Sequence, residues 1–322
     1  MKTISVVIPT YNEEENIPLI YQRVKELFRD QLKLYRYEIV YIDNRSTDSS
    51  RQVIEALCKQ DENVTGIFNA RNFGFNRSTY YGLIQGIGDC TVLLFADMQD
   101  PPEVIVDFVH AWEQGYKIVI GKKRKSKENK LMYMFRTIYY KLIKSITDID
   151  HIEQFTGFGL YDRDFIKVLQ KLDDSLPYLR GIVAELGYDR YEVQYDQDIR
   201  KHGKTSFNFL KLYDVAMLGI TSYSKVVLRL ATISGFVMSG ISFLIGCITF
   251  IVKLMYWDEF QMGLAGMSVG LFFIGSVLLF FIGFQGEYIL NINTRVMKRP
   301  LVIEERRLNP KVQNEEEDYG KQ

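Results

Sequence analysis

Cysteine, tryptophan and any excess of charge are all scarce in this sequence. Its 322 residues include 3 cysteines and 2 tryptophans, and 40 basic residues are balanced by 40 acidic ones. The cysteines are scattered and form no Cys-x-x-Cys pair, which argues against a disulfide framework and against a zinc site. A formal net charge of zero provides no general attraction to nucleic acid, so we expect no nucleic-acid partner.

Charged residues are also absent from two long stretches in the C-terminal third. Neither 230–252 nor 263–285 contains Asp, Glu, Lys or Arg, although these residues make up 25% of the chain. As helices, the stretches would each extend for about 35 Å, enough to cross a hydrocarbon core of about 30 Å. The flanking basic residues place both ends in the cytoplasm; they are Lys225, Arg229, Arg295, Lys298 and Arg299. The sequence therefore predicts a multi-pass protein of the cytoplasmic (inner) membrane.

The N-terminal part alternates between short apolar runs and longer amphipathic stretches. Such alternation predicts an α/β fold in which helices cover a mostly parallel sheet. The predicted strands are 4–9, 38–43, 66–69, 91–97 and 117–121, and the predicted helices are 14–29, 47–61, 76–88 and 103–114. We predict four regions: a cytoplasmic α/β domain (1–205), a juxtamembrane amphipathic helix (206–229), a transmembrane hairpin (230–290) and a cytoplasmic tail (291–322).

Polar residues follow the predicted strand at 91–97, where ligands bind in an open α/β sheet. Asp97 and Gln99 are two positions apart, so on an extended segment their side chains would project to the same side. A carboxylate and an amide oxygen suit a hydrated Mg²⁺ or Mn²⁺ that also binds a diphosphate. The segment taken alone is better explained by a strand that ends at Asp97 and a helix that starts at Asp100-Pro101, and the rest of the chain favours the ligand site.

The loops after the first two predicted strands carry further candidates. Tyr11 can stack on a base, Glu13 can reach a ribose, and Asp43 can accept the N–H of a pyrimidine ring. Ordinary capping turns explain both loops as well, since Ser46 or Thr47 can cap the following helix.

Four motifs occur in an order that carries a family resemblance. They are Val6-Val7-Ile8-Pro9-Thr10-Tyr11-Asn12-Glu13, Asp43-Asn44-Arg45-Ser46-Thr47-Asp48, Arg71-Asn72-Phe73-Gly74 and Ala96-Asp97-Met98-Gln99-Asp100-Pro101-Pro102-Glu103. Together they resemble the inverting family-2 glycosyltransferases of GT-A fold, a Rossmann-like architecture. Within these, the chain is similar over residues 1–300 to the polyprenyl-phosphate glycosyltransferases, the bacterial relatives of dolichol-phosphate mannose synthase.

The resemblance implies an enzyme that uses a nucleotide-diphosphate sugar, UDP-linked, as donor and a membrane-held polyprenyl phosphate, undecaprenyl phosphate in bacteria, as acceptor. It also implies Mg²⁺ or Mn²⁺, a homo-oligomer and a role in cell-envelope glycans. Carried over by position, it assigns nucleotide-sugar binding to Pro9, Tyr11, Glu13, Asp43, Asn72 and Asp97, and metal binding to Asp97 and Gln99. The resemblance assigns catalytic roles to Asp97, Arg200 and Lys204.

Basic residues in two further segments suit phosphate. Arg200 and Gly203 match the family's Arg-x-x-Gly-x-Ser-Lys loop, with Lys204 supplying a second charge beside the phosphates. Lys123, Arg124 and Arg136 belong to a basic loop and an aromatic helix that suit anionic headgroups and the acceptor phosphate. Solvated basic segments explain both regions without any ligand.

The chain departs from the family at two places. Phe95 stands where many relatives have the first carboxylate of Asp-x-Asp, and 157–160 lacks the aspartate proposed as their base. Glu153, Asp162 and Glu185 are unranked candidates for that base. A catalytically silent nucleotide-sugar-binding or interaction module therefore remains an alternative. A processive polysaccharide synthase is disfavoured because no Gln-x-x-Arg-Trp motif is present.

Overall fold

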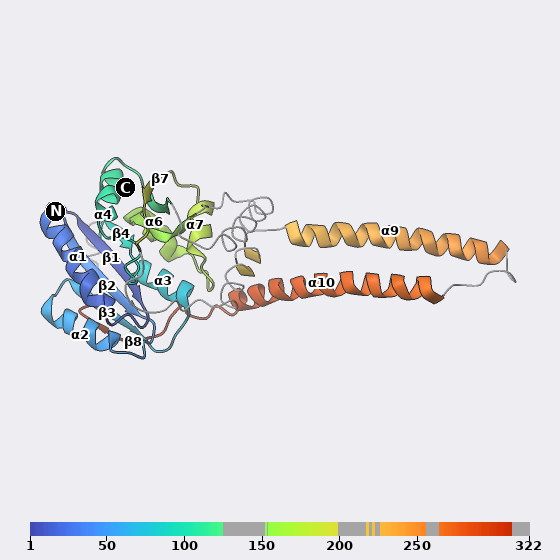
Figure 1. Ribbon diagram of the computed structural model, residues 1–322, viewed down its shortest axis with the longest axis horizontal. Coiled ribbons are helices and arrows are strands. Elements are labelled where there is room, and N and C mark those ends of the chain that lie inside the picture. The colour runs from blue at the N-terminus through green and yellow to red at the C-terminus, as the bar shows by residue number, and fades with distance from the viewer. Residues whose placement is uncertain are drawn as a thin grey trace.

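The molecule has an α/β body from which two long helices extend side by side (Figure 1). The computed structural model describes residues 1–124, 152, 154–198, 217–218, 221–222, 226–255 and 264–310.

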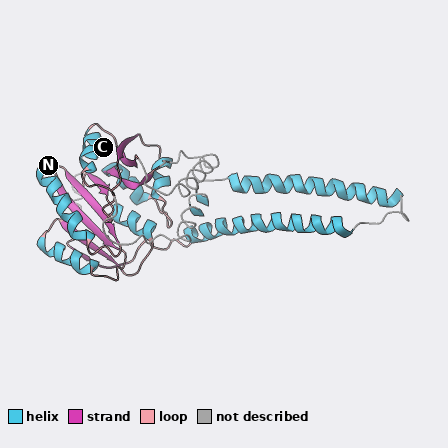
Figure 2. Cartoon of the chain, in the orientation of Figure 1, coloured by secondary structure: helices cyan, strands magenta, loops and turns pink. Residues whose placement is uncertain are grey.

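The body is built on an eight-stranded mixed sheet with the order β7-β5-β6-β4-β1-β2-β3-β8. The central pairs β4–β1, β1–β2 and β2–β3 are parallel. Strand β6 is antiparallel to both of its neighbours, β5 and β4, and β8 is antiparallel to β3. Figure 2 shows the strands in magenta between flanking helices. The strands are β1 (Thr3–Thr10), β2 (Arg36–Asp43), β3 (Val64–Asn69), β4 (Cys90–Leu93), β5 (Ile118–Lys123), β6 (Phe155–Asp162), β7 (Arg190–Tyr195) and β8 (Glu304–Leu308).

Helices cover both faces of the sheet because alternate strand residues point to opposite sides. In β1, Ile4, Val6 and Ile8 pack with α1, α2 and α4, whereas Val7 packs on the face covered by α3, α6 and α7. The result is a three-layer body with two apolar cores. The helices are α1 (Asn16–Asp30), α2 (Ser50–Gln60), α3 (Phe75–Leu83), α4 (Val104–Glu113), α6 (Arg163–Lys171) and α7 (Leu179–Glu185).

All five predicted strands and all four predicted N-terminal helices are present, with shifted ends. The largest correction concerns β4, which ends at Leu93 and not at the polar residues that follow. The pairing of β4 with β1 ends where Leu93 lies opposite Val7. The chain leaves the sheet after this pair, so Ala96 and Asp97 lie in a turn. The strands β6, β7 and β8 were not predicted, and the antiparallel pairing of β6 and β8 makes the sheet mixed.

Strand β8 returns to the body after both long helices. It pairs antiparallel with β3, with Leu308 opposite Gly66 and Arg306 opposite Phe68. The side chain of Asn309 then donates to the carbonyls of Cys58 and Val64, at 2.6 and 3.0 Å. The predicted tail at 291–322 therefore contributes an edge strand to the domain.

The long helices are α9 (Val226–Met255) and α10 (Leu264–Val296), and they contain the two predicted spans. Over the described residues, one segment, Phe273–Val296, is long and apolar enough to cross a membrane, and none of its most apolar window is buried within the molecule. That α9 and α10 cross a membrane stays a prediction. Most of the predicted juxtamembrane helix lies outside the described residues.

The body contacts the end of α10 through two ion pairs. Arg295 lies 3.4 Å from Asp174 and Lys298 lies 3.0 Å from Asp173, both in the segment between α6 and α7. The cytoplasmic end predicted for α10 is thus held next to the body.

Candidate active site

A cavity of about 970 Å³ opens at the carboxyl ends of the central strands. It is lined by loops that follow β1, β3 and β4, by helices α3 and α7, and by the end of α10. Seven residues singled out from the sequence line it: Pro9, Tyr11, Glu13, Asn72, Asp97, Gln99 and Lys123. The structure thus brings together residues from distant parts of the chain at the edge where open α/β sheets bind ligands.

The loops after β1 and β2 are fastened to each other by side-chain hydrogen bonds. Asn12, which has a positive φ of 56°, donates its backbone N–H to Ser46 Oγ at 3.0 Å and accepts from the Thr47 N–H at 2.8 Å. The N–H of Glu13 donates to Ser50 Oγ at 2.9 Å. These bonds fix the positions of Tyr11 and Glu13, which have a solvated cavity on their other side.

Asn44 joins the loop after β2 to the loop after β3. Its side-chain oxygen accepts from the Phe73 N–H at 2.9 Å, and its amide group donates to Asn72 Oδ1 at 3.0 Å. Asn72 Oδ1 also accepts from the N–H of Gly74, whose φ of 88° suits glycine. Asn72 therefore lines the cavity with its carbonyl oxygen already occupied, and Asn44 is a positioning residue that the sequence analysis did not single out.

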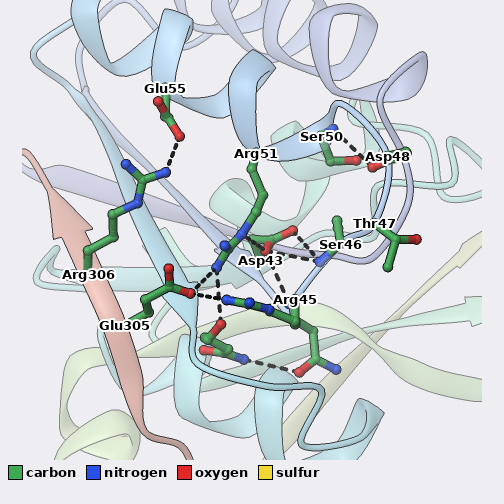
Figure 3. Close-up of polar contacts among 12 residues, drawn as sticks. Asp43, Arg45, Ser46, Thr47, Asp48, Ser50, Arg51, Glu55, Glu305 and Arg306 are labelled. Atoms are coloured by element: carbon green, nitrogen blue, oxygen red, sulfur yellow. Dashed lines mark hydrogen bonds and ion pairs between the residues drawn. The ribbon is translucent and has the colours of Figure 1, made fainter.

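Asp43 lies beneath the cavity and is not one of its lining residues. Its carboxylate is fully buried and accepts from the backbone N–H groups of Arg45 and Ser46, at 3.1 and 3.2 Å. Arg51 Nε donates to it at 2.8 Å. Figure 3 shows Arg51 between Asp43 and Glu305 of β8, so the acidic residue predicted to read the base is linked through Arg51 to a strand from the far end of the chain.

Asp97 and Gln99 meet through a turn, which corrects the extended geometry expected from the sequence. Met98 between them has a positive φ of 59°, and Asp97 Oδ1 accepts the Gln99 N–H at 3.2 Å. The backbone carbonyl of Gln99 accepts from the Asp198 N–H at 3.0 Å. Both side chains still line the cavity, because the turn directs them to the same opening.

Asp100 also lines the cavity and is nearly fully buried. It accepts a hydrogen bond from the hydroxyl of Tyr195 on β7. Burial raises the pKa of Asp100 to about 6, although the Lys123 charge and the Tyr195 hydroxyl act in the opposite direction. The contact ties the Asp97–Asp100 turn to the sheet.

The side-chain oxygens of Asp97 and Gln99 suit a hydrated divalent cation that is also coordinated by a bound ligand. The described residues contain no group of three or more His, Cys, Asp or Glu side chains placed to hold a metal. The Asp97 carboxylate and the Gln99 amide oxygen are hard donors on one turn, and Mg²⁺ commonly takes one or two carboxylates plus substrate phosphates and water. These residues would therefore hold such a cation only together with oxygen ligands from a bound substrate or water.

The predicted basic residues are distributed unevenly. Lys123 lines the cavity, whereas Arg124 lies 4.0 Å from Asp196 and does not. Arg136, Arg200 and Lys204 lie outside the described residues, as does the candidate base Glu153. Of the other candidate bases, Asp162 caps α6 and accepts from Trp112 Nε1 at 2.7 Å, so it has a structural role away from the cavity.

Several residues that line the cavity were missed by the sequence analysis. Arg77 and Thr79 come from α3 and Arg180 from α7, and the rings of Phe75 and Phe95 lie 5.6 Å apart at its wall. No motif marked these positions, because their placement depends on how α3 and α7 pack against the sheet.

The model of the family described as Glycosyl transferase family 2 matches residues 5–170. The chain belongs to this family. It is 34% identical over 301 residues to the SfII prophage-derived bactoprenol glucosyl transferase of Shigella flexneri, covering 93% of this chain and 96% of the relative. It is 32% identical over 301 residues to a prophage bactoprenol glucosyl transferase homolog of Escherichia coli (strain K12), covering 93% of this chain and 97% of the relative.

These matches confirm the resemblance drawn from the four motifs, since bactoprenol is a polyprenol. Among solved structures, glucosyl-3-phosphoglycerate synthase from Mycobacterium tuberculosis in complex with uridine diphosphate aligns with 68% of this chain and 78% of that chain. The TM-score is 0.48 and the sequence identity is 18%.

Proposed function

We propose that this family-2 glycosyltransferase transfers one sugar, with inversion, from a UDP-linked donor to a polyprenyl phosphate at the cytoplasmic face of the membrane. The observation that carries the proposal is the shared cavity: its walls come from the family-2 strand loops on one side and from the end of α10 on the other. A water-soluble donor and a lipid-anchored phosphate can therefore reach the same space. The names of the relatives favour a bactoprenol acceptor.

The residues proposed to bind the nucleotide of the donor lie in the loops after β1, β2 and β3. Tyr11 is about one-third exposed at the cavity and is free to stack on a base, while Glu13 lies two residues further on. Asp43 would accept the ring N–H of a pyrimidine, provided that the loop above it opens far enough to admit the base. The Asp97 turn would then lie at the diphosphate.

The transfer needs one bond to form and one to break at the anomeric carbon. An oxygen of the acceptor phosphate attacks from the face opposite the leaving diphosphate, which departs with the bonding electron pair and inverts the configuration. A phosphate monoester has a second pKa of about 6, so at neutral pH its attacking oxygen carries almost no proton to remove. A general base, usually worth about 10²–10⁴-fold, is therefore less needed here than with a neutral hydroxyl.

Asp97 and Gln99 would hold Mg²⁺ or Mn²⁺, which when bound neutralises charge on the leaving diphosphate. The family resemblance assigns the charge beside the phosphates to Arg200 and Lys204, which lie outside the described residues, and Lys123 at the cavity would bind the acceptor phosphate. The main contribution of the chain is then to orient the two substrates and to exclude competing nucleophiles from the anomeric carbon.

We also propose that α9 and α10 both span the membrane and that the body and the C-terminal strand lie in the cytoplasm, in a homo-oligomer assembled through the helices. The basic residues Lys298 and Arg299 follow α10 directly, which agrees with the positive-inside rule.

The test is a donor panel. Purified full-length protein in detergent is given labelled UDP- and GDP-sugars, a divalent cation and undecaprenyl phosphate, and the mass of the lipid product identifies the sugar. We expect a single hexose linked to the lipid phosphate. Nucleotide binding without any lipid-linked product, across the whole panel, would instead favour a catalytically silent binding module.

A further inference from the structure

Two arginines line the cavity on its side nearest the long helices. Arg77 is on α3 and Arg180 is on α7, and the same cavity is also lined by Asn291 and Thr294 of α10. Figure 1 shows α3 and α7 at the side of the body from which α9 and α10 extend. Neither arginine belongs to a motif that was used to propose the function.

Neither guanidinium has a hydrogen bond or an ion pair in the part of the chain that the structure describes. Other partly buried arginines do have them: Arg51 bonds Asp43 and Glu305, and Arg307 bonds Glu304. Arg77 is half-buried, and its pKa is lowered by burial and by the like charges of Arg71 and Arg299. Both arginine side chains at the cavity are therefore without an ion pair to a carboxylate of the described residues.

A buried hydroxyl on the same wall also has no partner. Thr79 is 4% exposed, lines the cavity, and its Oγ1 forms no hydrogen bond. Buried polar side-chain atoms nearly always have a partner in folded proteins, so an orphaned one at a cavity wall points to a ligand or a water. A hydroxyl and two guanidinium groups that line one cavity offer the donors that a phosphate requires.

We infer that Arg77, Arg180 and Thr79 form the binding site for the monoester phosphate of the lipid acceptor. This inference rests on the proposed function. The anion has charge to match the two guanidinium groups, and each planar guanidinium can bind two phosphate oxygens. Arg180 thereby contacts the nucleophile of the reaction.

The position of the site favours the acceptor over the diphosphate of the donor. The residues proposed for the nucleotide follow β1, β2 and β3, whereas Arg180 follows the segment in which Asp173 and Asp174 form ion pairs with Lys298 and Arg295 at the end of α10. A lipid phosphate stays at the level of the headgroups, so it enters from the side of the membrane helix.

The kinetic test compares Arg180→Gln and Arg77→Gln with the full-length wild type. We expect each variant to raise the KM for undecaprenyl phosphate by about tenfold or more, as is typical for a lost hydrogen bond to a charged group, while the donor KM changes by less than about twofold. Arg180→Lys should recover only part of the loss, because lysine lacks the planar fork. Arg36→Gln is the charge-matched control, since Arg36 is exposed at the start of β2, at the opposite end of the strands from the cavity.

Thr79→Val provides a second variant that keeps the shape of the side chain. It should raise the acceptor KM severalfold without lowering the melting temperature, because the hydroxyl has no partner to lose in the described structure. A fall in stability with an unchanged acceptor KM would assign Thr79 a purely structural role.

Direct binding separates this inference from the proposed function. Farnesyl phosphate, a soluble prenyl monophosphate, is titrated calorimetrically into each full-length variant without donor. Binding that weakens about tenfold in Arg180→Gln supports the site even if the wild type makes no lipid-linked sugar, in which case only the proposed function fails. Unchanged farnesyl phosphate affinity in both arginine variants, or a rise confined to the donor KM, overturns the inference.

Discussion

Glu305 on the last strand accepts a hydrogen bond of 3.0 Å from Arg51 on α2, although the two residues are 254 positions apart. The same guanidinium donates to the buried Asp43 at 2.8 Å (Figure 3). Glu305 also pairs with Arg45, and neighbouring Arg306 pairs with Glu55. Strand β8 is therefore connected through charged side chains to the loop proposed to bind the nucleotide.

We expect the replacement of Arg51 to lower the free energy of unfolding far more than the replacement of Glu305. Arg51→Met leaves the fully buried Asp43 without its counter-charge, which should lower the free energy of unfolding by about 3 kcal/mol. The side chain of Glu305 is 41% exposed, so Glu305→Gln should cost less than about 1 kcal/mol. Chemical denaturation in detergent and calorimetric affinity for UDP measure both effects. Equal losses in the two variants would show that Asp43 does not depend on Arg51.

Removing β8 should weaken the body and its nucleotide loop together. A chain that ends at residue 299 lacks β8, so the outer edge of β3 is left unpaired. Phe68 also loses Arg306, whose guanidinium lies 4.6 Å from its ring. We expect a melting temperature lower by at least about 5 °C and aggregation through the free edge of β3. Truncation after Pro310 keeps β8 and should behave like the intact chain. Similar stability of the two truncated forms would contradict this role.

Asp97→Asn should abolish most transfer while leaving the fold intact. The substitution keeps the size and the Asx turn with Gln99 but removes the charge proposed to bind the cation, so turnover should fall by about 10²-fold or more. The apparent Mn²⁺ concentration for half-maximal activity should rise as well. The exposed Asp107→Asn on α4 serves as control. Near-normal turnover and metal dependence of Asp97→Asn would rule out the metal role.

Asp61 should make the stability of the body depend on acid pH. Burial alone would raise its pKa, but hydrogen bonds from Tyr37, the Asn63 N–H and Tyr21 hold the pKa below the ordinary value of 3.8. The folded state therefore binds the proton more weakly than the unfolded chain, and the stabilisation is present above 3.8 and lost as the pH falls through the lowered value.

The matched experiment compares Asp61→Asn with Asp30→Asn, which alters a fully exposed carboxylate. At pH 7, Asp61→Asn should cost about 1–2 kcal/mol, and this difference from wild type should shrink toward the acid end of a denaturation series. A difference that is constant with pH would show that the effect of Asp61 is not one of charge.

The sequence predicted the elements whose apolar pattern is local. The runs at 4–9 and 38–43 are apolar enough to be identified as buried strands, and the amphipathic spacing of Ile17, Ile20 and Val24 marks α1. Strand β8 could not be found in this way. Its sequence, Glu-Glu-Arg-Arg-Leu, has no strand-like alternation, and it is a strand because the edge of β3 supplies hydrogen bonds and because its charges meet Arg45, Arg51 and Glu55.

The candidate site was predictable to a similar extent. Residues in motifs at the strand ends, such as Tyr11 and Asp97, do line one cavity. The sequence could not show that Asp43 lies beneath that cavity, since its burial depends on Arg51 and Glu305. Nor could it reveal Arg77 and Arg180, because two helices that are far apart in the chain bring them to the same wall.

The connectivity of β8 also sets an order of events during synthesis. The ribosome completes α9 and α10 before it makes Glu304–Leu308, so the sheet receives its last strand only after the whole hairpin exists. Until then Arg51 has Asp43 as a partner but lacks Glu305. A chain whose two long helices failed to double back would keep an open β3 edge, which makes completion of the α/β body a readout of correct hairpin assembly.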